Sequence, residues 1–169
     1  AIGLFALGRI PETFLLLRGH ELGMGVVELL LLWAAVHVVK VLTAEGAGRL
    51  ADRNGRRPVL LAGYLVYVLA LTGLALSVSV MHLWLLGLIL GLHFGLTEGA
   101  ERALVRDLAP TAERGTAFGW FHMIVGLAAI PAGLLLGGLW ALTSAKFAFL
   151  TSAGIALGAT LFFWWRVRA

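Results

Sequence analysis

The sequence has little charge and no cysteine. Lys and Arg number 13 and Asp and Glu 9, which is 13% of the 169 residues. That is about half of the ~25% found in soluble domains. So few charges exclude an ordinary soluble domain, a disordered chain and a free nucleic-acid-binding module. The lack of cysteine excludes disulfides, thiolate metal sites and a cysteine nucleophile.

Long apolar runs take the place of the missing charge. Hydrophobic residues make up 60% of the chain, and the mean hydropathy is +0.95. A membrane span needs about 20 mostly apolar residues, and lipid accepts only helices or closed barrels. We therefore predict an all-α membrane protein forming a single domain of six transmembrane helices. The predicted helices cover roughly residues 1–18, 23–45, 58–80, 82–105, 115–141 and 146–166.

Basic residues predict the orientation of these helices. Nine lie in the second-to-third connection, in the fourth-to-fifth connection and at the C-terminus, whereas the other side has only Arg18 and Lys146. The positive-inside rule places the nine, and both termini, in the cytoplasm. The net charge of +4 therefore reflects topology, not nucleic-acid binding. We expect a multi-pass protein of the bacterial inner membrane. The nine residues are Arg49, Arg53, Arg56, Arg57, Arg102, Arg106, Arg114, Arg166 and Arg168.

The first predicted helix is somewhat short for a bilayer. Eighteen residues rise about 27 Å, against a hydrocarbon thickness of about 30 Å. The chain also begins without Met, inside an apolar run. We expect it to be a fragment of a longer protein.

Polar residues inside the membrane follow a repeating pattern. The first, second, fourth and fifth predicted helices carry them, whereas the third has no charged residue or histidine between Val59 and Val80, and the sixth has none between Phe147 and Trp165. Such residues usually face a bundle interior or a wet cavity. We therefore predict two three-helix repeats, with four helices lining a polar path and the third and sixth facing lipid. The candidate residues for substrate binding or proton coupling are Arg9, Glu12, His37, Lys40, His93, Glu98, Glu101 and His122.

Each candidate has a functional and a structural interpretation. Glu98 and Glu101 could exchange protons or bind a cation, since carboxylates in an apolar setting titrate nearer neutral pH. Alternatively, Glu98 pairs with Arg102 four residues on, and Glu101 is solvated near the helix end. Arg9 either pairs with Glu12 or holds an anionic group near the midplane.

The histidines and Lys40 have similar alternatives. His37, His93 and His122 could relay protons, because histidine titrates near physiological pH. Each could instead be a hydrogen-bonded packing residue. Lys40 could line the path or extend toward the cytoplasm.

Glycines recur every fourth residue in the fourth predicted helix. Small residues at this spacing let helices approach closely. Tight packing is one interpretation, and sliding of this helix against a neighbour is the other. In the fifth predicted helix, Pro131 predicts a kink. The four glycines are Gly87, Gly91, Gly95 and Gly99.

The second-to-third connection reads GRLADRNGRR over residues 48–57. This resembles the cytoplasmic signature of the major facilitator superfamily, G-x-L-A-D-R-x-G-R-R/K, at every specified position. Residues 107–119 resemble the family's fourth-to-fifth connection. The fourth helix lacks the arginine typical of the N-terminal half, and residues 98–103 resemble second-half sequences. The resemblance therefore implies one six-helix half of a twelve-helix carrier, most similar to the C-terminal half.

The resemblance implies secondary transport of a small solute by alternating access, without a cofactor or metal. The expected partners are the solute, the bilayer and the other six-helix half. The signature would act as a cytoplasmic gate, although its arginines could equally serve only to fix topology. Its residues are Gly48, Asp52, Arg53, Gly55, Arg56 and Arg57.

Two other functions were weighed against transport. An intramembrane enzyme is disfavoured, because the sequence has no Gly-x-Ser-Gly segment and no H-E-x-x-H motif. A non-transporting structural or receptor-like domain, or a half that pairs with itself, stays open as the alternative. The cations hint at an anionic solute and the carboxylates at a cation or protons, so the sequence leaves the substrate open.

Overall fold

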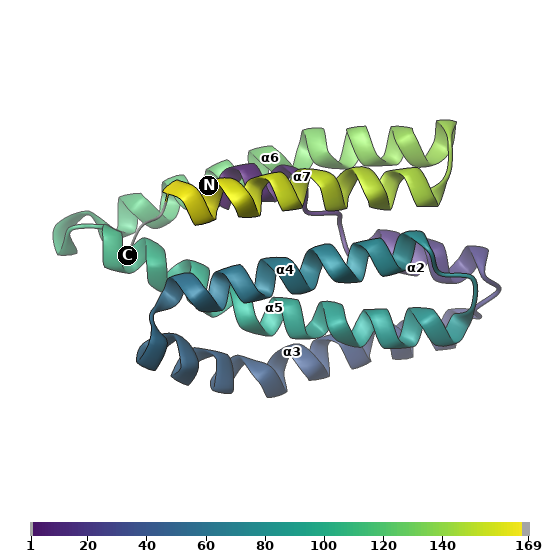
Figure 1. Ribbon diagram of the computed structural model, residues 1–169, viewed down its shortest axis with the longest axis horizontal. Coiled ribbons are helices and arrows are strands. Elements are labelled where there is room, and N and C mark those ends of the chain that lie inside the picture. Colours follow the sequence, from purple (N-terminus) through teal and green to yellow (C-terminus); the bar gives the residue numbers. More distant parts are fainter. Residues whose placement is uncertain (1, 167–169) are drawn as a thin grey trace.

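The computed structural model describes residues 2–166, and helices account for nearly all of them (Figure 1). This confirms the prediction of an all-α chain. Arg168, counted above for topology, and Ala1 lie outside the described residues. The helices are α1 (Ile2–Leu7), α2 (Thr13–Glu21), α3 (Val26–Asn54), α4 (Arg56–Ala75), α5 (Val80–Leu108), a short 3-10 turn η1 (Thr111–Glu113), α6 (Arg114–Leu142) and α7 (Ala145–Arg166).

The first predicted helix is not one helix. It is divided into α1, of 6 residues, and α2, of 9 residues, by a non-helical segment at 8–12. Pro11 lies in this segment, and proline inside a helix removes a backbone hydrogen bond and clashes with the preceding turn. Pro11 instead sits just before α2, where its carbonyl accepts a bond from the amide of Phe14 (3.0 Å). The prediction of a continuous helix over 1–18 is therefore wrong.

The other five predicted helices correspond to α3–α7, and each is long and apolar enough to cross a membrane. The main difference lies at 46–57, predicted as a connection. Helix α3 continues to Asn54, and α4 begins at Arg56, so Gly55 alone connects them. Gly55 has φ +89°, a conformation that glycine adopts without steric cost. Helix α6 continues through Pro131 as one helix.

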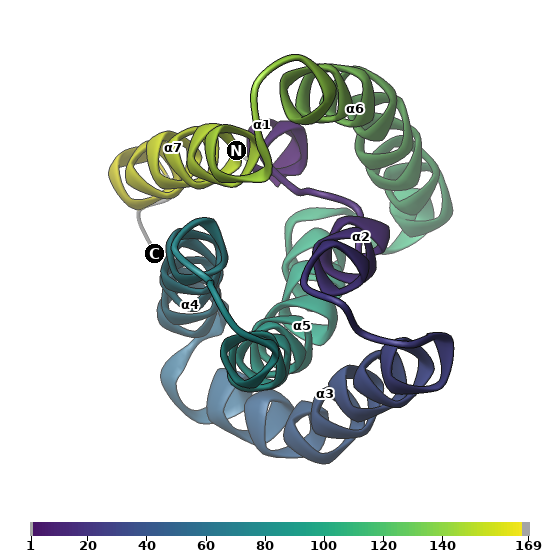
Figure 2. The same ribbon diagram turned by 90° about the vertical axis from the view of Figure 1, so that its right-hand side faces the viewer.

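The helices form two groups along a common long axis. Helices α3, α4 and α5 pack together, α1 packs against α6 and α7, and α4 packs against α7 where the two groups meet. Helix α2 lies with α3 and α5, so α1 and α2 belong to different groups (Figure 2). The α3–α4 and α5–α6 connections, which carry most of the arginines, lie at one end of the molecule, and the α4–α5 and α6–α7 turns lie at the other (Figure 1).

Burial differs from the predicted division between lining and lipid-facing helices. The most apolar stretches of α4 and α7 are 50% and 44% buried within this chain, against 11% for α3 and 17% for α6. Helices α4 and α7 bury Tyr64, Phe149 and Phe163 while keeping leucines on their outer faces. The third and sixth helices therefore hold the core of the chain together, and do more than face lipid.

Three of the four repeating glycines serve close packing between α5 and α3. A Cβ at Gly91 would lie 2.5 Å from the carbonyl oxygen of Val36, and one at Gly87 would lie 2.8 Å from the side chain of Leu32. A Cβ at Gly95 would overlap Thr43, whereas Gly99 has open space around it. This supports the packing interpretation for the first three glycines.

Candidate functional site

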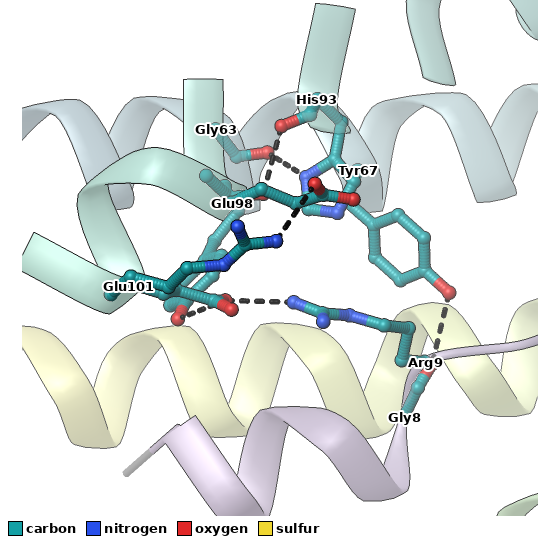
Figure 3. A network of polar contacts seen from close by, with 10 residues as sticks. Gly8, Arg9, Gly63, Tyr67, His93, Glu98 and Glu101 are labelled. Atoms are coloured by element: carbon teal, nitrogen blue, oxygen red, sulfur yellow. Dashed lines mark hydrogen bonds and ion pairs between the residues drawn. The ribbon is translucent and has the colours of Figure 1, made fainter. Parts of the chain in front are cut away.

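The break between α1 and α2 exposes backbone groups that buried side chains satisfy. The amide of Ile10 donates to the Tyr67 hydroxyl (2.7 Å), which in turn donates to the carbonyl of Gly8 (3.3 Å). Ser152 Oγ of α7 donates to the same carbonyl. Unsatisfied backbone groups are costly in lipid, so the hydroxyls of α4 and α7 make the break tolerable. Figure 3 shows Tyr67 reaching Gly8.

Arg9, inside the break, forms a buried ion pair with Glu101 of α5. Its Nη2 lies 2.7 Å from Oε1 of Glu101, and the two side chains are 23% and 4% exposed. The Tyr64 hydroxyl donates to the same carboxylate oxygen (3.0 Å), and the Tyr64 ring stacks on Phe5. The predicted Arg9–Glu12 pair is therefore replaced by a pair 92 residues apart in sequence. Glu101 is 4% exposed, which excludes the interpretation that it is solvated, and Figure 3 shows its carboxylate facing Arg9.

His93 lies in the same buried region. Its Nδ1 is 2.8 Å from the carbonyl of Gly63, and its ring packs 4.6 Å from that of Tyr67. Because a carbonyl only accepts, Nδ1 carries the proton and Nε2 has a lone pair. Within residues 2–166, Nε2 has no hydrogen-bond partner. His93 therefore packs among buried aromatic side chains and is hydrogen-bonded through Nδ1.

Lys40 and Glu98 connect α3 to α5. Nζ of Lys40 lies 2.6 Å from Oε1 of Glu98, and 5.9 Å from the centre of the Phe94 ring. Nη2 of Arg102 lies 3.4 Å from the other oxygen of Glu98. Glu98 therefore has two cationic neighbours, and both the predicted Arg102 pair and a cross-helix pair are present.

Glu12 meets α3 on the other side of the break. Its Oε2 accepts a hydrogen bond from Nε1 of Trp33 (3.2 Å) and lies 3.7 Å from Nε2 of His37. The Glu12 side chain is 32% exposed. His122 does not join any of these groups: it is exposed on α6 beside Phe121.

A cavity of about 420 Å³ lies beside the break, between α2, α3, α5 and α6. Arg9 and Glu12 are its charged lining residues, and the remainder are mainly apolar or aromatic. Its size lies within the ~300–1,000 Å³ typical of small-molecule sites. Arg9 belongs to one charged cluster and Glu12 to the other, so one residue of each cluster faces the same solute-sized cavity. The lining residues used below are Ala6, Arg9, Glu12, Trp33, Phe94, Val125 and Ala129.

The 48–57 segment ties helix ends together at the arginine-rich end. Arg56 pairs with Asp52 one turn earlier, and its Nε lies 3.3 Å from Oδ2 of Asp107 on α5. Arg57 donates to the carbonyl of Trp164 near the end of α7. The segment therefore connects the ends of α3, α4, α5 and α7. Gly48 has open space around it, and the described residues give Arg53 no ion pair.

Sequence reasoning missed Tyr64, Tyr67 and Ser152. Charged residues and histidines alone give no candidate in the apolar stretches of α4 and α7, because that criterion leaves out hydroxyl side chains. The signal was available, because the two tyrosines of the sequence lie three residues apart in one apolar helix. A buried tyrosine usually finds a hydrogen-bond partner, which makes such a pair a candidate anchor.

Comparison with known proteins gives a family match. The family model described as Major Facilitator Superfamily matches residues 5–169. An "Uncharacterized MFS-type transporter" of Methanocaldococcus jannaschii is 32% identical over 160 residues, covering 91% of this chain and 40% of that protein. A chloramphenicol resistance protein of Pseudomonas aeruginosa is 39% identical over 127 residues, 70% of this chain and 29% of that protein.

A tetracycline resistance protein, class B, of Escherichia coli is 32% identical over 137 residues. That match covers 80% of this chain and 34% of the relative. The chain thus spans about two fifths or less of the length of these relatives. Their printed names describe transport or resistance and no enzyme activity.

Proposed function

The chain belongs to the Major Facilitator Superfamily, and on this premise we propose that it is one six-helix half of a secondary carrier for a small solute. The short coverage of the relatives supports a half-carrier. Helices α1 and α2 together would form the first of six spans, and α3–α7 the other five. The spans would form two three-helix repeats, with the chain as the C-terminal half.

One observation carries this proposal: a solute-sized cavity, lined by Arg9 and Glu12 among apolar residues, lies at the break between α1 and α2. Carriers place their sites near the bilayer midplane, beside interrupted helices. The other half would close the open side of the cavity. Alternating access would then come from rocking of the two halves about this site.

Proton coupling would use the carboxylates of α5. Glu101 is buried against Arg9, which also lines the cavity. Protonating Glu101 would remove the counter-charge of Arg9 and change the charge that a solute meets. Glu98 is a second candidate, since its protonation would release Lys40 of α3. Either event would bias the equilibrium between inward-facing and outward-facing states.

The 48–57 segment would act as the cytoplasmic gate. The ion pairs of Arg56 with Asp52 and Asp107 connect helix ends in the present arrangement. They would hold one state of the carrier and break in another. Exposed ion pairs contribute about 0–1 kcal/mol each, so such a latch could open readily.

The test is uptake by proteoliposomes that contain the intact polypeptide with this chain. Tetracycline, chloramphenicol, D-xylose and tetraphenylphosphonium serve as probes, each with and without an imposed pH gradient. The proposal expects at least one probe to accumulate only with the gradient. Flux of every probe at the level of protein-free liposomes would contradict it, and would favour the non-transporting alternative.

Glu98→Gln tests the coupling separately. It should weaken pH-driven uptake more than it lowers the melting temperature, because Glu98 is one-third exposed. Glu45→Gln is the matched control, since Glu45 lies on the exposed face of α3 and, among residues 2–166, its ion-pair partner is Arg49 alone. Unchanged coupling in Glu98→Gln would exclude Glu98 and leave Glu101 as the candidate.

The mass of the native polypeptide tests the half-carrier directly. A product at least twice this length supports a carrier with two halves. A product of 169 residues would favour the alternative in which the half pairs with itself.

A further inference from the structure

We infer that the cavity beside the break binds an organic cation with aromatic or apolar substituents, and that Glu12 and Trp33 recognise it. The inference rests on the proposed carrier function and names the class of its substrate. It follows from the charge balance of the cavity, the hydrogen bonding of His37 and the nature of the remaining walls.

Glu12 is the carboxylate of this region that has no cationic partner. Glu101 is paired with Arg9, and Glu98 with Lys40 and Arg102. Across residues 2–166, no Lys or Arg nitrogen lies within 4.0 Å of the Glu12 carboxylate. Since Glu101 already neutralises Arg9, the uncompensated charge of the cavity is that of Glu12.

His37 does not neutralise Glu12 when its ring is uncharged. Its Nδ1 lies 3.0 Å from the carbonyl of Trp33, and a carbonyl only accepts, so Nδ1 carries the proton. The other nitrogen, Nε2, then points a lone pair at the carboxylate 3.7 Å away. Glu12 is oriented by Trp33 and has no Lys or Arg opposite it among residues 2–166, so with His37 uncharged a bound cation would complete the arrangement.

The walls favour an organic cation over a hydrated metal ion. Trp33 is 45% exposed and lines the cavity with Phe94, Val125 and Ala129. An indole ring attracts a cation through its face, and apolar side chains can pack on hydrocarbon substituents. These walls offer few oxygens to replace the hydration shell of a metal ion. An anion would meet the negative charge of Glu12.

The experiment is equilibrium binding to the purified intact polypeptide in detergent, followed by Trp fluorescence. The probe is tetraphenylphosphonium, and the matched control is tetraphenylborate, which has nearly the same shape and the opposite charge. We expect saturable binding of the cation and none of the anion. Equal binding of both probes, or of neither, would overturn the inference.

Variants locate the site. Glu12→Gln should weaken cation binding by about 10- to 100-fold, as for a contact to a charged group. Trp33→Leu should weaken it by about 3- to 30-fold and Trp33→Phe by less, because Phe keeps a ring face. Glu45→Gln should leave it unchanged. Cation binding that is insensitive to Glu12→Gln and Trp33→Leu would overturn the assignment to this cavity.

The two experiments distinguish failure of the cation site from failure of the carrier function. Uptake of another probe without tetraphenylphosphonium binding would refute the cation site and leave the carrier standing. Tetraphenylphosphonium binding without flux of any probe would support the site and refute the carrier.

Discussion

Two charged clusters lie on either side of the same five-residue break, and they differ in almost every physical respect. Arg9 pairs with a carboxylate that is 4% exposed and also bonded to Tyr64. Glu12, three residues on, is 32% exposed, and its partners among residues 2–166 are the indole N–H of Trp33 and the imidazole of His37, with no Lys or Arg. The first cluster is complete within the chain and holds α1 to α5. The second is incomplete, which is the condition for binding something else.

The largest expected effect of this difference between the clusters is on the free energy of unfolding of variants in which one carboxylate is neutralised. Glu101→Gln leaves the Arg9 guanidinium without its counter-charge, and breaking a buried pair costs about 3–5 kcal/mol. Glu12→Gln, at a carboxylate that is one-third exposed and has no Lys or Arg partner among residues 2–166, should change stability by about 0.5 kcal/mol or less. Thermal unfolding of both variants in detergent measures the contrast.

A double variant tests whether the stability lost in Glu101→Gln comes from the unpaired charge of Arg9 or from altered packing. Arg9→Met combined with Glu101→Gln removes both charges, so it should recover part of the lost stability, since replacing both partners is often nearly neutral. Equal melting temperatures for Glu101→Gln and Glu12→Gln would show that the two clusters do not differ as described.

The second-largest expected effect concerns the close approach of α3 to α5, which keeps α3 close to both clusters. Gly95→Ala places a Cβ against Thr43 and 2.9 Å from the carbonyl of Lys40. Overpacking of this kind costs about 1–3 kcal/mol. It should also lengthen the Lys40–Glu98 contact. Thermal unfolding measures the cost, with Gly99→Ala as control because a Cβ there meets open space. Equal loss in both would contradict the packing role.

The smallest expected loss of stability concerns the hydrogen bond that Tyr67 makes to the backbone of the break. Tyr67→Phe leaves the amide of Ile10 without its acceptor, while Ser152 still donates to Gly8. Interhelical hydrogen bonds in membranes contribute about 0.6 kcal/mol on average and at most about 1.7. Hydrogen exchange at Ile10 should rise with a modest loss of stability. Thr72→Val is the control, because Thr72 bonds only the carbonyl of Val68 on its own helix.

Five long helices could be predicted because their apolar runs exceed the thickness of a bilayer and end at charged or polar turns. The break could not be predicted from hydropathy alone. Residues 1–18 are apolar on average, and averaging hides the local effect of Pro11 between Arg9 and Glu12. The α3–α4 connection was placed too broadly because arginines signal a cytoplasmic position but do not interrupt a helix.

The sequence predicts which side chains are charged more directly than it predicts their partners. Arg9, Lys40, Glu98 and Glu101 all take part in ion pairs. Helical spacing predicts partners three or four residues away, whereas Arg9–Glu101 joins the break to α5 and Lys40–Glu98 joins α3 to α5. Such pairs depend on how α1, α3 and α5 pack, which no local pattern encodes. His122, chosen for its residue type alone, joins no cluster.

The break between α1 and α2 also has a consequence for biosynthesis. These two helices, of 6 and 9 residues, are each far shorter than a bilayer span requires. Tyr67, Glu101 and Ser152, which satisfy the backbone of the break and pair with Arg9, are all synthesised later than α1 and α2. Membrane integration of residues 2–21 is therefore expected to be delayed, with this segment held at the interface until α4, α5 and finally α7 have been synthesised.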